Sequence, residues 1–241
     1  MFETEVIVNE SMVDKAGRLK LSCLLRFQQG ICEQHTEKFG LPSSVIREQL
    51  GLAFVFTKIR VNTYRLPGLN EKIVVTTWCS ELKGVRFTRN FRVTLQDTGE
   101  LLTESKAEIT VIDLNTRKLI RPASVPEFDM FLYNETEPNG CDYPQKLPAE
   151  VEAYNNVLRQ ITEADIDNNN HVNNTVYADM VTETLADEYL KINPSVFEIN
   201  YLHEAFLNET MKINLSKIEQ GVLVVGSVGD KQSFAAKIIY K

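Results

Sequence analysis

The chain has 241 residues and a net charge of −7 at pH 7, and 43% of its residues are hydrophobic. This length suits one large domain or two modest ones, each able to bury a core. The acidic balance argues against a general nucleic-acid-binding protein. Because no 18-residue apolar run occurs and residues 1–5 do not resemble a signal peptide, we expect a soluble cytoplasmic protein without a membrane span.

The first half of the chain predicts one strand, one long helix and four further strands. Residues 2–9 alternate as in a strand, and the apolar residues of 22–39 recur at helical spacing. Short turns containing Gly or Pro separate the later strands. These strands span residues 53–65, 72–83, 85–96 and 100–113.

Residues 122–150 differ in composition, with five prolines and an Asn-Gly pair at 139–140. We expect an ordered linker that crosses a surface rather than another sheet. The earlier pattern then restarts with a strand near 156–161 and a helix over 174–190. Four more strands follow, near 196–206, 209–218, 221–229 and 232–240.

The two halves form an internal repeat. Leu-Asn-Glu occurs at 69–71 and again at 207–209, in the same turn of each half. Each half could wrap a curved sheet around its helix, and joining the two sheets would hide their edge strands. We therefore predict an α+β double hotdog, with an N-terminal hotdog at 1–121, the linker at 122–150 and a C-terminal hotdog at 151–241.

Residues 165–174 are the most informative segment, because two carboxylates, five asparagines and His171 lie together. An apolar stripe from Val176 onward predicts a helix that begins near Asn173 or Asn174. Backbone N–H groups and the positive end of the helix dipole would then face His171 and could stabilise an oxyanion. The segment indicates a reaction site, although a turn that only caps the helix would have the same local composition.

Metal sites are poor fits to the same segment. Asp165, Asp167 and Asn169 match the first ligand positions of an EF-hand loop, but Asn170 and Val176 stand where that loop needs Gly and Glu. One histidine with two carboxylates is not a recognisable zinc ligand set. We therefore predict neither a metal nor another cofactor.

Cysteines and one further histidine fit a structural role. No CxxC pair occurs, so we expect buried, reduced thiols. The thiols belong to Cys23, Cys32, Cys79 and Cys141. His35 falls near the apolar face of the first predicted helix, where a core or helix-face histidine is the expected role.

The 165–174 segment resembles the D-x-D-x-N-x-H-V-N-N motif of the acyl-acyl-carrier-protein (acyl-ACP) thioesterases, plant and bacterial enzymes that release fatty acids from the carrier protein. Similar segments of the family occur in the same order in the first half. They are Trp78, the 83–84 Lys-Gly turn with Arg86, and residues 97–100 and 115–119. The resemblance spans most of the chain. It implies a double hotdog that hydrolyses fatty acyl-ACP in fatty acid biosynthesis.

The family's catalytic residues fall on Asp167, Asn169, His171 and Glu204. A cysteine often follows the glutamate in the family, but this chain has Ala205 there. The resemblance therefore implies direct attack by water.

Roles within this set are a hypothesis. Glu204 and Asp167 would orient and deprotonate the water, Asn169 would hold the geometry, and His171 would act as acid/base or oxyanion donor. Which carboxylate is the base stays open. Asn173 and Asn174, at the expected helix start, would direct N–H groups at the carbonyl oxygen.

Strand alternation predicts the positions of Glu204 and His203, and the repeat predicts which first-half residue corresponds to Glu204. We expect Glu204 on the first strand after the 174–190 helix, with His203 on the opposite face. Leu66 stands at the first-half equivalent of Glu204 in the shared turn, so we expect one active site per chain. The first half would instead shape the acyl pocket. Candidate lining residues are Phe54, Phe56, Trp78, Phe87 and Phe91.

The resemblance implies an acyl carrier protein with a phosphopantetheine-linked acyl chain as partner. An acidic carrier would need a positive surface on this acidic chain. The basic residues available are Lys83, Arg86, Arg89, Arg117 and Lys118. Because the repeat already supplies the sheet pairing that single hotdogs gain by dimerising, a monomer is feasible, and a homodimer stays open.

Three other functions compete. An acyl-CoA thioesterase would use identical chemistry. A hotdog hydratase has a related motif, but His171 comes one residue too early for it and Glu204 would have no task. A non-catalytic acyl-thioester sensor would not need four polar groups of catalytic type.

Overall fold

The computed structural model describes residues 1–129, 137–148 and 152–240. Its first half contains β1 (Phe2–Ile7), α1 (Leu21–Glu37), α2 (Ser43–Glu48), β2 (Leu52–Thr63), β3 (Lys72–Lys83), β4 (Arg86–Leu95), β5 (Leu101–Asp113) and the short β6 (Leu119–Ile120). The second half contains β7 (Asn155–Gln160), α3 (Val176–Leu185), α4 (Asp187–Lys191), β8 (Pro194–Tyr201), β9 (Thr210–Ile218), β10 (Gly221–Val228) and β11 (Lys231–Tyr240). Four single-turn 3₁₀ helices lie at Glu10–Met12, Pro122–Ser124, Pro126–Phe128 and Glu163–Asp165.

All the described strands belong to one antiparallel sheet whose order shows the internal repeat. The path is β1-β3-β4-β5-β2-β8-β11-β10-β9-β7, and β6 pairs with β5 off this path. Read from either outer edge, the strands occur in the same order within their half. The halves join where β2 pairs with β8, from Lys58 opposite Asn200 to Asn62 opposite Val196. This arrangement is the predicted double hotdog.

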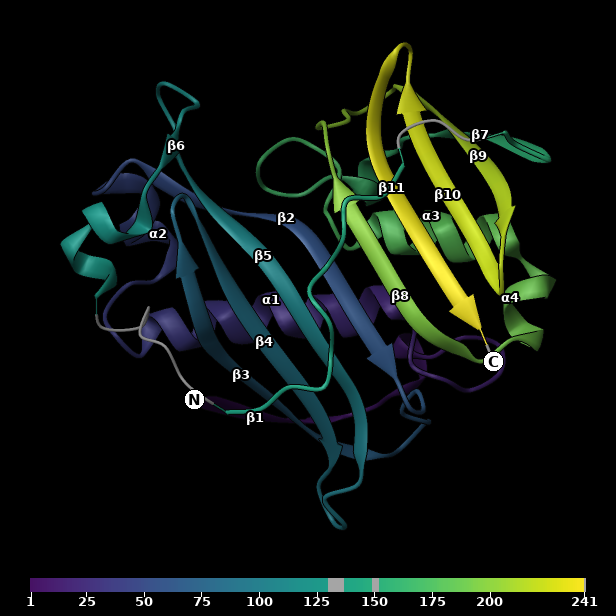
Figure 1. Cartoon of the computed structure of the whole chain (residues 1–241), viewed down its shortest axis with the longest axis horizontal. Helices are drawn as coiled ribbons and strands as arrows, with labels where there is room; N and C mark the ends of the chain where they lie inside the picture. The colour runs from purple at the N-terminus through teal and green to yellow at the C-terminus, as the bar shows by residue number, and fades with distance from the viewer. Residues whose placement is uncertain (130–136, 149–151, 241) are drawn as a thin grey trace.

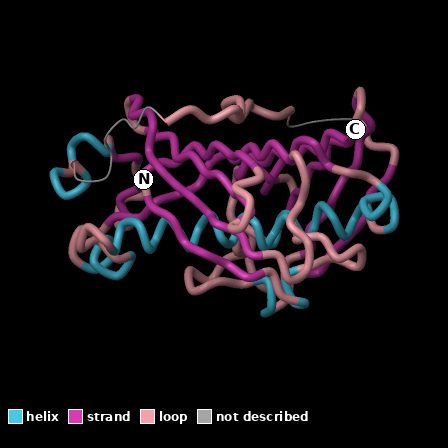
Figure 2. Tube along the Cα trace, turned by 90° about the horizontal axis from the view of Figure 1, so that it is seen from below, coloured by secondary structure: helices cyan, strands magenta, loops and turns pink. Residues whose placement is uncertain are grey.

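Helices α1 and α3 lie on one face of the sheet and contact each other (Figures 1 and 2). The apolar stripe predicted for the second helix is buried throughout. Its residues are Val176, Tyr177, Met180, Val181, Leu185 and Tyr189. His35 is also buried, as expected of a core histidine. None of the described helices is long and apolar enough to cross a membrane.

One described segment of the linker, residues 137–148, crosses the opposite face of the sheet from the helices (Figure 2). Two buried carboxylates hold it there: Glu104 accepts the Gly140 N–H at 3.0 Å, and Glu198 accepts the Gln145 N–H. Glu198 also pairs with Arg60 and Lys237, each at 3.0 Å. Residues 130–136 and 149–150 of the predicted linker, with 151 and 241 of the second half, lie outside the described residues.

Two boundaries differ from the sequence expectations in ways that affect the site. The second long helix begins at Val176, later than Asn173 or Asn174, and is interrupted at Ala186, whose φ is 46°. β8 ends at Tyr201, so Glu204 lies in the following loop and not on a strand. Helix α2 and strand β6 had no clear sequence signal.

All four cysteines have free thiols, as expected; Cys23, Cys79 and Cys141 are buried, whereas Cys32 is partly exposed.

Candidate active site

The Asx-rich segment folds into a tight hairpin between the Glu163–Asp165 turn and α3. The Asp167 N–H donates to the His171 carbonyl at 3.0 Å, and Asn170 forms the tip with a φ of 63°. Asparagine tolerates this left-handed conformation better than most residues. The Asn169 N–H closes an Asx turn on Asp167 Oδ1 at 2.7 Å. As a result, Asp167 Oδ1 lies 3.7 Å from His171 Nδ1.

Asp165 anchors the base of this hairpin. Its buried carboxylate accepts Arg159 Nη2 at 2.9 Å and the Thr162 N–H at 2.9 Å, and its carbonyl accepts the Asn173 N–H at 2.9 Å. Burial alone would raise the pKa of Asp165, but the hydrogen bonds from Arg159 and Thr162 outweigh it and hold the pKa below its ordinary value. Asp165 therefore acts as a structural anchor that fixes the hairpin of residues 167–171.

His171 presents one ring nitrogen to the open side of the site. Its Nδ1 lies 3.2 Å from the Val172 carbonyl, which can only accept, so Nδ1 holds the proton in the neutral ring. Nε2 is then a free base, 3.9 Å from Glu204 Oε1. The His171 and Asp167 side chains are 22% and 19% exposed, so the site is open to water.

Glu204 reaches His171 from the loop after β8. The prediction that Glu204 lies on a strand is wrong, because β8 ends at Tyr201. The loop is nevertheless held against the Asx-rich hairpin, because the Ala205 carbonyl accepts the Val172 N–H at 2.8 Å. The neighbouring His203 is exposed and its Nδ1 donates to the Gln232 carbonyl at 2.7 Å. The predicted catalytic groups Asp167, His171 and Glu204 therefore lie together, and His203 is bonded elsewhere.

Arg117 comes to the site from the other half of the chain. Its Nη2 lies 3.3 and 3.2 Å from the two carboxylate oxygens of Glu204. Asp113 shapes the turn that delivers it by accepting the backbone N–H groups of Asn115 and Thr116. Sequence reasoning had assigned Arg117 to carrier docking only, because nothing local shows that the turn after β5 meets a loop 87 residues later.

The two asparagines at the expected helix start have different surroundings. The Asn173 N–H donates to the Asp165 carbonyl, and Asn173 Oδ1 accepts the Thr175 N–H at 2.9 Å. The backbone N–H of Asn173 is therefore not available to an oxyanion. Asn174 has no hydrogen bond among the described residues and is half-buried. The prediction for Asn173 as a backbone donor is wrong, whereas that for Asn174 stays a prediction.

Arg89 does not belong to a docking surface. Only 2% of the residue is exposed, because it faces the helices from β4 on the same side as Phe87 and Phe91. Lys83, Arg86, Arg117 and Lys118 are exposed. The prediction that Arg89 is one of the carrier-docking residues is therefore wrong.

The grouping of Asp167, His171 and Glu204 does not have the geometry of a metal site. Among the described residues, no three His, Cys, Asp or Glu side chains are grouped closely enough to hold an ion. Asp165, the first position of the EF-hand-like pattern, is committed to Arg159 and Thr162.

The first half contains the same hairpin with different side chains. The Asp14 N–H donates to the Arg18 carbonyl at 2.8 Å, and Gly17 forms the tip with a φ of 75°. Asp14 and Arg18 thus occupy the positions of Asp167 and His171. They form an ion pair at 2.9 Å.

Arg18 serves as a structural contact between the halves. Its Nη1 donates to the Ile192 carbonyl at 2.7 Å, and its guanidinium lies 5.2 Å from the centre of the Tyr189 ring. The Pro67 carbonyl accepts a backbone N–H from the hairpin of the first half, as the Ala205 carbonyl does from the hairpin of the second half. Leu66 therefore stands where Glu204 stands, as the repeat indicated.

The sequence matches two adjoining family domains: the N-terminal domain of acyl-ACP thioesterases over residues 1–127 and their C-terminal domain over 149–237. The chain belongs to the acyl-ACP thioesterase family. It is 22% identical over 175 residues to an oleoyl-acyl carrier protein thioesterase of Arabidopsis thaliana, covering 68% of this chain and 47% of that protein. It is 27% identical over 150 residues to a palmitoyl-acyl carrier protein thioesterase of Cuphea hookeriana, covering 58% and 35%. The chain therefore spans less than half the length of these two plant relatives.

Solved structures share the whole fold with this family member. An acyl-ACP thioesterase from Bacteroides thetaiotaomicron superposes with a TM-score of 0.89 at 20% identity, covering 100% of this chain and 97% of the other. The 12:0-ACP thioesterase from Umbellularia californica gives 0.82 at 20% identity, covering 100% and 96%. The double hotdog is thus a fold that known acyl-ACP thioesterases have.

Replacing Asp165 with Asn should destabilise the protein by about 2 kcal/mol, because the half-buried Arg159 loses the closer of its two carboxylate partners and the capping hydrogen bonds weaken. The contribution of a carboxylate with a depressed pKa is present above its unfolded pKa of about 3.9 and is lost as the pH falls through the lower folded value. The difference in unfolding free energy from wild type should therefore be constant from neutral pH to about pH 4 and shrink below it. Chemical denaturation across this range measures it. Asp97→Asn, in an exposed turn, is the control, and an equal effect of both variants would contradict the assignment.

Proposed function

We propose that this protein hydrolyses the thioester of fatty acyl-ACP and releases free fatty acid in fatty acid biosynthesis. The observation that supports it best is that Asp167, His171 and Glu204 lie around one open site in a chain of the acyl-ACP thioesterase family. A histidine with a free Nε2 between two carboxylates is suited to activating water.

The reaction begins with a water that hydrogen-bonds to both Glu204 and His171 Nε2. The 3.9 Å between these groups exceeds a direct hydrogen bond and suits a shared water. Its oxygen attacks the thioester carbon, forming the C–O bond, while its proton passes to Nε2 or to the carboxylate. The C–S bond then breaks, and the proton goes to the departing phosphopantetheine sulfur. Ala205 leaves no thiol beside Glu204 for a covalent route.

Three polar groups support this step without taking the proton. Asp167 lies 3.7 Å from His171 Nδ1 and stabilises the imidazolium that forms. Asn169 holds Asp167 through its backbone N–H and its Nδ2, at 2.7 and 3.3 Å. Asn174, with its N–H groups unused among the described residues, is the candidate donor to the oxyanion.

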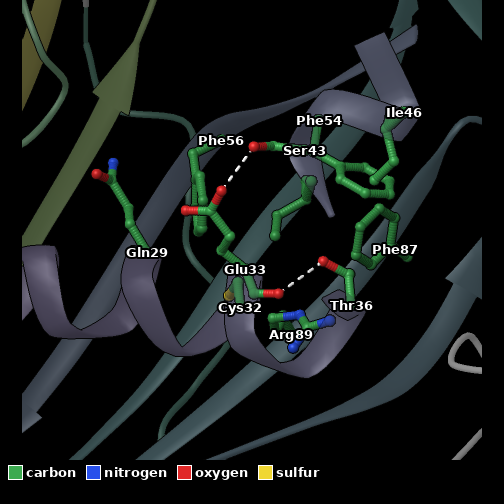
Figure 3. A pocket seen from close by; sticks show the side chains of 11 residues that line it. Gln29, Cys32, Glu33, Thr36, Ser43, Ile46, Phe54, Phe56, Phe87 and Arg89 are labelled. Atoms are coloured by element: carbon green, nitrogen blue, oxygen red, sulfur yellow. Dashed lines mark hydrogen bonds between the residues drawn. The ribbon is translucent and has the colours of Figure 1, made fainter. Parts of the chain in front are cut away.

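The halves have separate tasks in this proposal. Residues 151–241 supply the catalytic side chains, residues 1–121 hold the acyl chain, and 122–150 link them. A cavity of about 200 Å³ in the first half supports the second task; Phe54, Phe56 and Phe87 line it (Figure 3). Trp78 and Phe91, also expected in the pocket, are fully buried core residues outside its lining.

The carrier protein would dock on exposed basic residues near the site. Lys83, Arg86, Arg117 and Lys118 are the candidates. Arg86 pairs with Glu108 at 3.2 Å and is 56% exposed, so its charge is available only in part. The β2–β8 pairing joins the two hotdogs within one chain, so a monomer suffices for the fold.

Asp167→Asn, His171→Ala and Glu204→Gln should each lower kcat by about 10²- to 10⁴-fold, the usual contribution of a positioned acid or base. His203→Ala is the matched control, because His203 adjoins Glu204 but bonds to Gln232. Release of free thiol and fatty acid is followed with acyl-ACP and with the matching acyl-CoA. Unchanged turnover in all three variants would contradict the mechanism, and faster release from CoA would move the substrate to acyl-CoA.

Arg117→Met should lower kcat about fivefold, as expected for an exposed ion pair that contributes up to about 1 kcal/mol to holding Glu204. The substrate is an acyl-pantetheine, which has no carrier protein, so a docking role cannot contribute. Lys118→Met, one residue away and exposed, is the control. An equal further loss when Arg117→Met is added to Glu204→Gln would show that Arg117 does not act through Glu204.

A further inference from the structure

Arg89 is a cation enclosed in the first half. It lies on β4 opposite Cys79 of β3, with its side chain between the sheet and α1. Its Nη1 donates to His35 Nδ1 at 3.1 Å and to Thr77 Oγ1 at 3.4 Å. The thiols of Cys32 and Cys79 also lie close to it.

None of these partners balances the charge of Arg89. Burial, together with the positive charge of Arg89, lowers the pKa of His35 to about 4, so its Nδ1 is a neutral acceptor at pH 7. Although part of residue Cys32 is exposed, its thiol is enclosed, and this burial raises the pKa of Cys32 to about 12, so the thiol is neutral as well. Arginine stays protonated in proteins. Within residues 1–129, 137–148 and 152–240, no carboxylate forms an ion pair with Arg89.

A buried charge without a counter-charge is unfavourable, and such groups are normally paired. Two half-buried arginines of this protein follow that rule: Arg60 pairs with Glu198 at 3.0 Å, and Arg92 pairs with Glu137 at 3.0 Å. Arg89 departs from it. Since none of the described carboxylates pairs with it, we look to a bound molecule for a partner to its charge.

Arg89 faces the space where such a partner would bind. It lines the cavity of about 200 Å³ between α1, α2 and the sheet (Figure 3). The remaining wall is largely apolar, with Ile46, Phe54 and Phe87. Glu33 also lines the cavity, but it is exposed and accepts Ser43 Oγ at 2.6 Å. The cavity wall is thus mostly apolar, with one buried cation, Arg89, and one exposed carboxylate, Glu33.

The catalytic groups lie elsewhere, which fixes the direction of a bound chain. Asp167, His171 and Glu204 do not line this cavity. A substrate whose thioester lies at His171 would therefore place a remote part of its acyl chain beside Arg89. A plain methylene chain would leave the charge of the guanidinium unbalanced, whereas an oxygen on the chain would bring a partial or full negative charge to it.

We propose that the cavity binds an acyl chain with an oxygen function remote from the thioester, a carboxylate, hydroxyl or oxo group, and that Arg89 binds that oxygen. The inference rests on the proposed hydrolysis for the identity of the substrate and names its class. A carboxylate would bind best, because hydrogen bonds between two charged groups are the strongest.

The test compares acyl-ACPs of matched lengths that end in methyl, hydroxyl or carboxylate. Wild-type protein should hydrolyse the carboxylate- or hydroxyl-ended chain with a kcat/KM about tenfold or more above the methyl-ended chain, since a site with buried polar groups discriminates against a ligand that leaves them unpaired. In Arg89→Met the ratio should fall to about one or reverse. Arg26→Met, an exposed arginine of α1, should keep the wild-type ratio.

Two further measurements separate the alternatives. Binding of non-hydrolysable thioether analogues with the same three chain ends is measured directly, and Arg89→Lys retains the charge if Arg89→Met does not fold. Preferential binding that depends on Arg89 without hydrolysis would refute the proposed function and leave this inference standing. Equal binding of the three chain ends by the wild type would overturn the inference. So would an Arg89→Met variant that only accepts longer methyl-ended chains, since Arg89 would then merely limit the depth of the cavity.

Discussion

The antiparallel pairing of β2 with β8 is the interaction on which the rest of the structure depends. Five residue pairs, from Lys58–Asn200 to Asn62–Val196, turn two separate sheets into one. The same junction sets α1 against α3 and brings the turn at 113–118 to the loop that contains Glu204. Because Arg117 and Glu204 come from different halves, neither half alone has the complete set of contacts at the site.

The internal repeat shows how one backbone can serve two purposes. The hairpins around Asp14 and Asp167 have the same hydrogen bonds and the same left-handed tip. In the first half the histidine position is Arg18, whose charge is used on Asp14 and on the end of α4. In the second half the same place holds His171, and the site stays open. The geometry is thus a property of the loop, while the chemistry depends on single side chains.

Local patterns predicted most of the fold. The first helix and the strands of the first half have bounds within about two residues of those expected, because alternation and helical spacing are set by which face is buried. The start of α3 was missed because Asn173 closes a turn on Thr175 before the helix begins. Glu204 was placed on a strand because the apolar alternation gives no sign that β8 ends at Tyr201.

Contacts distant in sequence were the part that could not be predicted. The motif indicated Asp167 and His171, which are four residues apart on one hairpin, and the resemblance added Glu204. The role of Arg117 beside Glu204 and the burial of Arg89 depend on pairings across the sheet, so both were grouped with surface charges. An arginine on a strand has the same sequence pattern whether it faces water or a cavity.

We propose that the thioester lies in the second half while its acyl chain lies in the first. The most direct measurement is a structure of the His171→Ala protein with a non-hydrolysable acyl-phosphopantetheine. We expect the carbonyl analogue between residue 171 and Glu204, with the acyl chain in the cavity lined by Phe54, Phe87 and Arg89. A chain bound against α3 within the second half, or a carbonyl analogue away from Glu204, would contradict it.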